Sequence, residues 1–159
     1  MENSIVLAPV GYVASPIHEA IDDVWGGVRA QIHLDESRFS EDCLEGLIEF
    51  SHIEVLFQFH LVPVDGVERG ARHPRGRVEW PRAGIFAQRA KARPNRLGVS
   101  ICRLHSVRGL TLEVEGLDAV DGTPVVDIKP YMEEFGPKGL VRQPDWSREL
   151  MVGYWNSAR

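Results

Sequence analysis

The sequence of 159 residues is poor in cysteine, contains no long apolar run and carries no excess of basic residues. Cys43 and Cys102 provide neither a disulfide framework nor the spacing of a metal site, so we interpret both as small core residues of a reduced, cytoplasmic protein. No apolar run approaches the roughly 20 residues that a membrane helix requires, and the N-terminal residues lack the basic region of a secretory signal. The net charge of −5 by itself argues against a nucleic-acid-binding protein.

The motifs of several enzyme classes are missing as well. The sequence contains no Gly-x-Ser-x-Gly nucleophile elbow, no Walker phosphate loop and no Gly-x-Gly-x-x-Gly turn that would open a dinucleotide-binding helix. Its six histidines form no His-Glu-x-x-His pair and no cluster with cysteines, so we expect no metal site. Predicted strands do not alternate with long helices, which argues against a Rossmann-type fold.

Short segments of alternating apolar and polar residues make up most of the chain. The clearest segment is 50–62, whose apolar face consists of Ile53, Val55, Phe57, Phe59 and Leu61. Further strands are predicted at 5–13, 28–34, 84–89, 97–107, 110–115 and 125–131. Pro9 places the first of these at a sheet edge, and Arg108-Gly109 predicts a hairpin turn. Many short strands and few helices indicate a mostly β protein, an antiparallel barrel or sandwich.

Helices are expected at two places only. A short helix is predicted after Ser40, because acidic residues would occupy its first turn. Near the end of the chain, Asp145 is expected to cap a short helix that starts at Trp146 and whose apolar side includes Tyr154. This helix would be a lid on its own chain or a dimer contact. We therefore expect a β domain over 1–131, with 132–159 as an extension of the same domain.

One segment is strongly basic although the whole chain is acidic. Between Arg69 and Arg96 there are nine basic residues and a single acidic residue, Glu79, which gives a local charge of +8. This charge indicates a site for an anion such as phosphate or an RNA backbone, or a solvated loop that pairs with acids elsewhere on the surface. Much of the segment lies in the long polar connection 63–81, which we expect to be functional or mobile.

Four sequence blocks carry a resemblance to a known family. They are Gly11-Tyr12-Val13 with Ser15-Pro16; Gly46-Leu47 with Phe50-Ser51-His52-Ile53; Gly84-Ile85-Phe86-Ala87 with Arg89, Arg93-Pro94-Asn95 and Leu97-Gly98-Val99-Ser100; and Gly116-Leu117-Asp118 with the run from Asp121 to Tyr131. On these blocks the sequence resembles the TrmO family, also called TsaA-like or YaeB-like, over most of residues 10–131. It departs from the family at Gln88 and Ala90, where Thr and Ser are usual, and at Arg96, where a second proline is common.

The resemblance implies a small antiparallel β-barrel that binds S-adenosylmethionine and works as a homodimer. The implied reaction is methylation of the N6 nitrogen of N6-threonylcarbamoyladenosine at tRNA position 37. Two alternatives stay open: methyl transfer to a small-molecule acceptor, and a cofactor-binding regulatory module without turnover. Longer bacterial members carry an additional C-terminal domain, whereas this sequence ends soon after the predicted barrel, which leaves the tRNA acceptor open.

The resemblance also implies which residues form the site. The cofactor would be bound by Trp25, Phe59, His60, Arg89, Val99, Gly116, Leu117 and Asp118. Among these, Asp118 can accept hydrogen bonds from hydroxyl or amino groups, and Arg89 can form a planar fork with a carboxylate. RNA would be contacted by Arg75, Arg77, Arg93 and Asn95. Methyl transfer needs positioning more than acid–base chemistry. Asp121 is a candidate base or simply a turn residue, and Asp127 is a candidate base or a partner in a structural ion pair.

Overall fold

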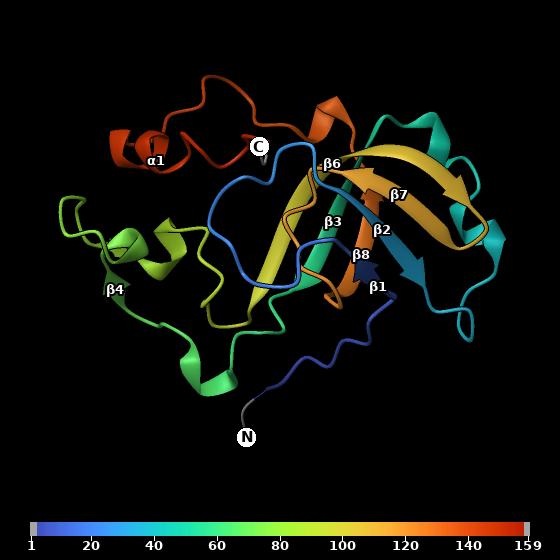
Figure 1. The fold of residues 1–159 in the computed structure, drawn as a ribbon, viewed down its shortest axis with the longest axis horizontal. Helices are drawn as coiled ribbons and strands as arrows, with labels where there is room; N and C mark the ends of the chain where they lie inside the picture. Colours follow the sequence, from blue (N-terminus) through green and yellow to red (C-terminus); the bar gives the residue numbers. More distant parts are fainter. Residues whose placement is uncertain (1–2, 158–159) are drawn as a thin grey trace.

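The computed structural model describes residues 3–157, within which six strands close an antiparallel β-barrel (Figure 1). The strands follow one another around the barrel in the order β1 (Gly11–Ala14), β2 (Arg29–Leu34), β7 (Thr111–Glu115), β6 (Leu97–Arg108), β3 (His52–Gln58) and β8 (Pro124–Pro130). The sheet closes at β1, which pairs with β2 on one side and with β8 on the other. The prediction of a mostly β protein is confirmed. Of the two predicted folds, the closed sheet is the barrel and not the sandwich.

Alternation along the strands places apolar side chains inside the barrel. In β3, Ile53, Val55 and Phe57 are at most 1% exposed, whereas the residues between them are half-buried. β2 and β7 contribute the buried Ile32 and Val114 in the same way. Removing such surface from water is the main favourable term in folding, at about 25 cal/mol per Å². Side chains fill the interior of so small a barrel, so a binding site must lie at its ends or on its outside.

Several short elements lie outside the barrel. The connection after β3 contains a two-stranded sheet of β4 (Ala71–Arg72) and β5 (Ala83–Gly84). The short 3-10 helices are η1 (Glu41–Leu44), η2 (Leu47–Glu49), η3 (Val64–Gly66), η4 (Pro74–Gly76), η5 (Ile85–Ala87) and η6 (Glu133–Phe135). In Figure 1, α1 (Asp145–Leu150) lies on the same side as β4, and its Glu149 accepts a hydrogen bond of 2.7 Å from the Trp80 indole. Among the helices of residues 3–157, none combines the length and apolar character needed to cross a membrane.

The first strand differs from its prediction in length and in position. The predicted strand over 5–13 is wrong for residues 5–10, because β1 begins only at Gly11. Ile5 and Val6 are 87% and 90% exposed, so this apolar run is not buried. The predicted edge position is also wrong. Pro9 lies before the strand, where its missing N–H does not interrupt the pairing of β1 with either neighbour.

Two other predicted strands are shorter or replaced by a helical turn. β3 stops at Gln58 instead of continuing to 62, and Leu61 is 53% exposed, so its predicted inward position is wrong. The predicted strand over 84–89 is wrong because the chain forms η5 after β5. The buried Ile85 is followed three positions later by the buried Gln88, whose backbone N–H donates to the Ile85 carbonyl at 3.2 Å. This spacing belongs to a helical turn.

Two expectations about single residues are corrected. Cys43 is exposed whereas Cys102 is buried in the core, so only Cys102 is the small core residue expected. Asp145 is the first residue of α1 rather than its cap, which is Pro144, and it still places an acidic residue in the first turn, at the positive end of the helix dipole. The first predicted helix is present as η1, and the turn at Gly109 joins β6 to β7 as predicted.

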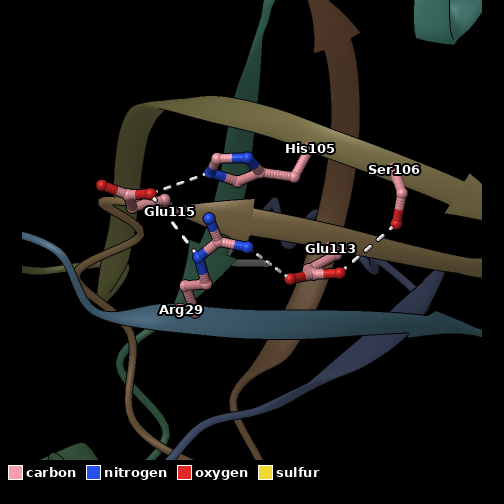
Figure 2. A network of polar contacts seen from close by, with 5 residues as sticks. All are labelled: Arg29, His105, Ser106, Glu113 and Glu115. Carbon is pink, nitrogen blue, oxygen red and sulfur yellow. Dashed lines mark hydrogen bonds and ion pairs between the residues drawn. The ribbon is translucent and has the colours of Figure 1, made fainter.

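A polar network crosses three strands on the outside of the barrel (Figure 2). Arg29 of β2 forms an ion pair of 2.8 Å with Glu113 of β7 and lies 3.8 Å from Glu115. The pairing of β6 with β7 contains a bulge whose extra residue is His105, and its Nε2 lies 2.8 Å from Glu115. Exposed pairs of this kind contribute at most about 1 kcal/mol each. Their effect is to fix the end of β7, from which the next loop starts.

Gly98 of β6 lies against two phenylalanine rings. A Cβ atom there would be 2.6 Å from Phe57 and 2.9 Å from Phe59, so alanine would force the rings out of their positions. We expect Gly98→Ala to lower the free energy of unfolding by about 1–3 kcal/mol, measured by urea denaturation. Gly84→Ala is the matched control, because nothing lies within 4 Å of its added Cβ. Equal stability of the two variants would contradict this packing.

Candidate cofactor site

The loop that follows β7 carries a half-buried carboxylate. Gly116 has a φ of +81°, a left-handed conformation that glycine adopts without strain, and it turns the chain out of the strand. Leu117 is fully buried in the core, which fixes the position of Asp118 next to it. Oδ1 of Asp118 accepts a hydrogen bond from the Ser100 hydroxyl, and Oδ2 accepts one from the Tyr154 hydroxyl. Two donors from distant parts of the sequence therefore hold one carboxylate.

Tyr154 keeps its proton in this arrangement. Burial raises the pKa of its hydroxyl above the ordinary value, and the negative charge of Asp118 acts in the same direction. The positive charges of Arg89 and Arg75 act in the opposite direction and are outweighed. Because the phenol stays protonated, it remains a hydrogen-bond donor to the carboxylate. The phenol therefore donates to the carboxylate within the field of two guanidinium groups.

Arg89 reaches this region from the turn after η5. Its Nη2 donates to the backbone carbonyl of Val99 at 2.7 Å, which fixes the guanidinium beside β6. Val99 precedes Ser100, so Arg89 lies next to the part of the strand that holds Asp118. Arg89 is exposed, and its remaining N–H groups can bind an anion such as a carboxylate. We refer to Arg89, Ser100, Asp118 and Tyr154 as the Asp118 cluster.

The loop between β1 and β2 is fixed beside the cluster. Trp25 is 3% exposed, and its backbone N–H donates to the Tyr154 carbonyl at 2.8 Å. Its neighbour Val24 has a φ of +65°, which costs a β-branched residue about 1–3 kcal/mol and persists only where the surroundings impose it. Asp23 forms two hydrogen bonds with the Arg75 guanidinium, at 3.0 and 2.9 Å. Contacts of both neighbours of Val24, Asp23 and Trp25, therefore hold the strained loop in place.

Phe59 and His60 lie just beyond the end of β3. The Phe59 ring packs edge-on against Phe57, with ring centroids 5.3 Å apart. Nδ1 of His60 lies 3.4 Å from the hydroxyl of Thr123, at the far end of the loop that carries Asp118. Within residues 3–157 neither side chain forms a hydrogen bond to the Asp118 cluster. Their part in cofactor binding stays a prediction.

The basic segment 69–96 is only partly neutralised by ion pairs. Arg77 pairs with Glu79 and lies 4.2 Å above the centre of the Trp80 ring, and Lys91 is 3.7 Å from Asp22. Other guanidinium groups donate to backbone carbonyls instead, namely those of Arg82, Arg89, Arg93 and Arg96. A neutral carbonyl orients a guanidinium without cancelling its charge, so these four side chains keep their positive charge.

The turn with the predicted RNA contacts Arg93 and Asn95 has an unusual backbone. Arg93 is half-buried and donates to the Gln88 carbonyl at 2.9 Å, whereas Asn95 is exposed. Arg96 has a φ of +51°, which proline cannot adopt because its ring holds φ near about −65°. The missing second proline therefore matches the local conformation. RNA binding by these residues, and by Arg75 and Arg77, stays a prediction.

Both candidate bases have partners within the chain. Asp121 accepts a hydrogen bond of 3.0 Å from the Ser15 backbone and lies 3.5 Å from Nδ1 of His18. Asp127 accepts a hydrogen bond of 2.7 Å from the Lys129 side chain. These contacts match the turn role and the ion pair that were the alternatives, and a catalytic role of either carboxylate stays a prediction. Within residues 3–157, no group of three or more His, Cys, Asp or Glu side chains is arranged to hold a metal ion.

Ser100 and Tyr154 were not among the predicted site residues. Ser100 is 6% exposed at an inward position of β6, and a hydroxyl there requires a buried partner. A serine at an inward strand position was therefore the sequence feature that could have indicated Ser100 as a site residue. Tyr154 is 36 positions away from Asp118, and no local pattern connects them.

Comparison with known proteins identifies the family. The sequence model of the tRNA-methyltransferase O N-terminal domain matches residues 20–136. This chain belongs to the tRNA-methyltransferase O (TrmO) family. The TrmO-family chain is 40% identical to a probable S-adenosyl-L-methionine-binding protein of Methanothermobacter thermautotrophicus, over 86% of the chain and 96% of that protein. It is 37% identical to the tRNA (adenine(37)-N6)-methyltransferase of Escherichia coli, over 82% of the chain and 59% of that enzyme.

A solved structure and a mammalian relative extend the comparison. A crystal structure of TrmO from Pseudomonas aeruginosa aligns with a TM-score of 0.74 at 29% identity, covering 92% of this chain and 63% of that one. The mouse tRNA (adenine(37)-N6)-methyltransferase is 32% identical over 86% of the chain, which spans 33% of the mouse enzyme. The predicted family is confirmed, and this TrmO-family chain corresponds to part of its longer relatives.

The raised pKa of Tyr154 predicts a specific loss of stability at alkaline pH. Since the folded pKa lies above the unfolded value of about 10, this contribution is complete below about pH 10 and is lost as the pH rises through the folded pKa. We expect Tyr154→Phe to lose less stability than the wild type above about pH 10, measured by urea denaturation at each pH. Burial raises the pKa of Cys102 to about 12, but both proteins contain this residue, so its effect on stability cancels in the comparison. Parallel pH curves would contradict the buried position of the phenol.

Proposed function

We propose that this chain is an S-adenosylmethionine-dependent methyltransferase that acts on the N6 nitrogen of N6-threonylcarbamoyladenosine at tRNA position 37. The observation that supports the proposal most is the Asp118 cluster, because neighbouring residues of β6, Val99 and Ser100, hold a guanidinium and a carboxylate that are expected to bind the cofactor. The names of the Escherichia coli and mouse relatives support the reaction. The name of the archaeal relative supports the cofactor.

The charges of the cluster suit S-adenosylmethionine. The cofactor supplies a methyl group on a positively charged sulfur and also carries an amino group, a carboxylate and ribose hydroxyls. Asp118 offers acceptor oxygens to hydroxyl or amino groups, and Arg89 offers donors to a carboxylate. Phe59 adds aromatic surface, which attracts cations, whereas Trp25 is buried and is proposed to fix the loop beside the cluster. The remaining proposed contacts are His60, Val99, Gly116 and Leu117, of which Leu117 is buried and acts through its backbone.

The chain contributes alignment more than proton transfer. Asp118 is held by two hydroxyl donors and Arg89 by a carbonyl, so neither group has to be ordered when a ligand binds. A carboxylate accepts several hydrogen bonds, so Asp121 and Asp127 retain acceptor positions beside their present partners. Either of them can take the proton that the nucleophilic nitrogen loses, as can water.

The basic segment 69–96 supports tRNA as the acceptor. Guanidinium groups bound to neutral carbonyls form an oriented positive surface, and phosphate contacts of this kind position RNA. Arg93, which donates to a carbonyl, is proposed to meet a phosphate. Arg75 and Arg77 are proposed to meet phosphates in exchange for their ion pairs with Asp23 and Glu79. The exposed Asn95 is proposed to meet a base or the threonyl group.

We further propose a cytoplasmic homodimer in which residues 1–131 and 132–159 of each chain form one domain. Phe86 and Phe135 are 79% and 85% exposed, and a subunit contact is proposed to bury them. The hydrogen bond between Trp25 and Tyr154 supports a single domain. Sedimentation equilibrium tests the dimer, which a monomer at micromolar concentration would exclude. Two separate unfolding transitions would exclude the single domain.

A second candidate function is a cofactor-binding regulatory module without turnover. Two observations favour it: both candidate bases have structural partners, and the archaeal relative, 96% of which is covered, is named only as a binding protein. Methyl transfer to a small molecule is a third candidate. The acceptor experiment below separates the three.

Replacing Arg89 tests the proposed cofactor contact. A hydrogen bond to a charged group contributes about 1.5–3 kcal/mol, so we expect Arg89→Ala to bind S-adenosylmethionine roughly 10- to 100-fold more weakly in equilibrium dialysis. Arg108→Ala, at the exposed end of β6, removes the same charge and is the matched control. Unchanged affinity in a folded Arg89→Ala protein would count against the assignment.

Transfer of a labelled methyl group tests the acceptor. We expect label from S-adenosylmethionine to enter tRNA that lacks this modification, with an affinity for tRNA that falls steeply as salt increases. Arg93→Ala should reduce the slope of log affinity against log salt by about 0.7–0.9, the contribution of one phosphate contact. Salt-insensitive transfer to a small molecule would favour the third candidate. Cofactor binding without label in any RNA or small molecule would favour the regulatory module.

A further inference from the structure

We propose that Tyr154 is a positioning residue of the cofactor site, which acts by holding the Asp118 carboxylate in its binding orientation. This inference rests on the function proposed above, because it assigns a role within the same site. Tyr154 lies beyond α1, outside residues 20–136, which match the family's domain. The chain therefore supplies a part of the site from a segment that the domain match does not include.

The segment with Tyr154 is attached to the loop between β1 and β2 by its backbone. The backbone N–H groups of Val24, Trp25 and Gly26 donate to carbonyls of residues 153, 154 and 156, at 3.2, 2.8 and 3.2 Å. A Cβ atom on Gly26 would lie 1.8 Å from the Trp155 carbonyl oxygen, so only glycine allows this approach. Backbone contacts alone therefore fix the path of the chain at Tyr154.

A second attachment holds the helix that precedes Tyr154. The Trp80 indole, itself 5% exposed, donates to Glu149 of α1 at 2.7 Å. On the other side, the Trp155 ring lies 4.0 Å from the place of a Cβ on Gly116, two residues before Asp118. These contacts leave the Tyr154 ring half-buried with its hydroxyl on Oδ2 of Asp118.

Holding the carboxylate affects binding because an aspartate side chain otherwise rotates. Ser100 restrains Oδ1 and Tyr154 restrains Oδ2, so both oxygens are fixed and each retains an open acceptor position. A ligand then binds without the cost of ordering the side chain. Without the Tyr154 hydroxyl, the Asp118 side chain has to be ordered when the ligand binds, and Oδ2 can turn away from the ligand.

Calorimetry on full-length proteins measures the effect on affinity. We expect Tyr154→Phe to bind S-adenosylmethionine about two- to tenfold more weakly than the wild type, because the ligand then has to order the Asp118 side chain when it binds. Tyr12→Phe removes the same hydroxyl from the outer face of β1 and should leave the affinity unchanged. Equal affinity of wild type and Tyr154→Phe would overturn the inference, as would tighter binding by Tyr154→Phe, which would mean that the phenol competes with the ligand.

A spectroscopic measurement separates positioning from a structural role. The chain has three tyrosines, so a sample with ¹³C-labelled tyrosine rings gives few signals, and the Tyr154 signal is the one missing from Tyr154→Phe. We expect saturating S-adenosylhomocysteine to shift the Tyr154 signal and to leave the Tyr12 signal in place. An unmoved Tyr154 signal at saturation would overturn the inference while the proposed function stands. Absence of any binding to the wild type would overturn the proposed function and the inference with it.

Discussion

The hydrogen bonds on the Asp118 carboxylate are the interactions on which the rest of the site depends. A half-buried anion requires donors, and here Ser100 and Tyr154 provide them. Ser100 belongs to the barrel, whereas Tyr154 follows the only α-helix in residues 3–157. Satisfying one carboxylate therefore connects the end of the described chain to the barrel wall. The same segment supports the strained loop at Val24, so three parts of the sequence share one cluster of polar contacts.

The barrel is the rigid support for these contacts rather than their location. Its interior is filled, and its strands end in loops that carry the polar groups. β6 contributes most, because Gly98 accommodates the phenylalanine rings at the end of β3, Val99 binds Arg89 and Ser100 binds Asp118. One strand thus determines how a positive and a negative side chain are placed relative to each other. The basic segment on the same side of the barrel adds a surface for an anionic partner.

The sequence predicted features that depend on neighbouring residues. Alternation identified β3, and a glycine turn identified the β6–β7 hairpin, because both patterns are local. Several strand ends were predicted wrongly, because alternation does not show where a chain turns. After β3 the backbone N–H groups of His60 and Val62 bond the Gln58 and Phe59 carbonyls in a turn. Gln88 turns inward to bond the distant Arg72 and Ala83 carbonyls. Motif residues such as Asp118 were found from the family resemblance. The partnership of Asp118 with Tyr154 exists only in three dimensions, so no local pattern revealed it.

A crystal structure of the protein with S-adenosylhomocysteine tests most directly whether the Asp118 cluster binds the cofactor. We predict that polar groups of the ligand lie within hydrogen-bond distance of Asp118 and Arg89, while the Tyr154 hydroxyl still donates to Asp118. A ligand bound elsewhere on the barrel would contradict the assignment of the site. A ligand that takes the place of the Tyr154 hydroxyl would contradict the positioning role.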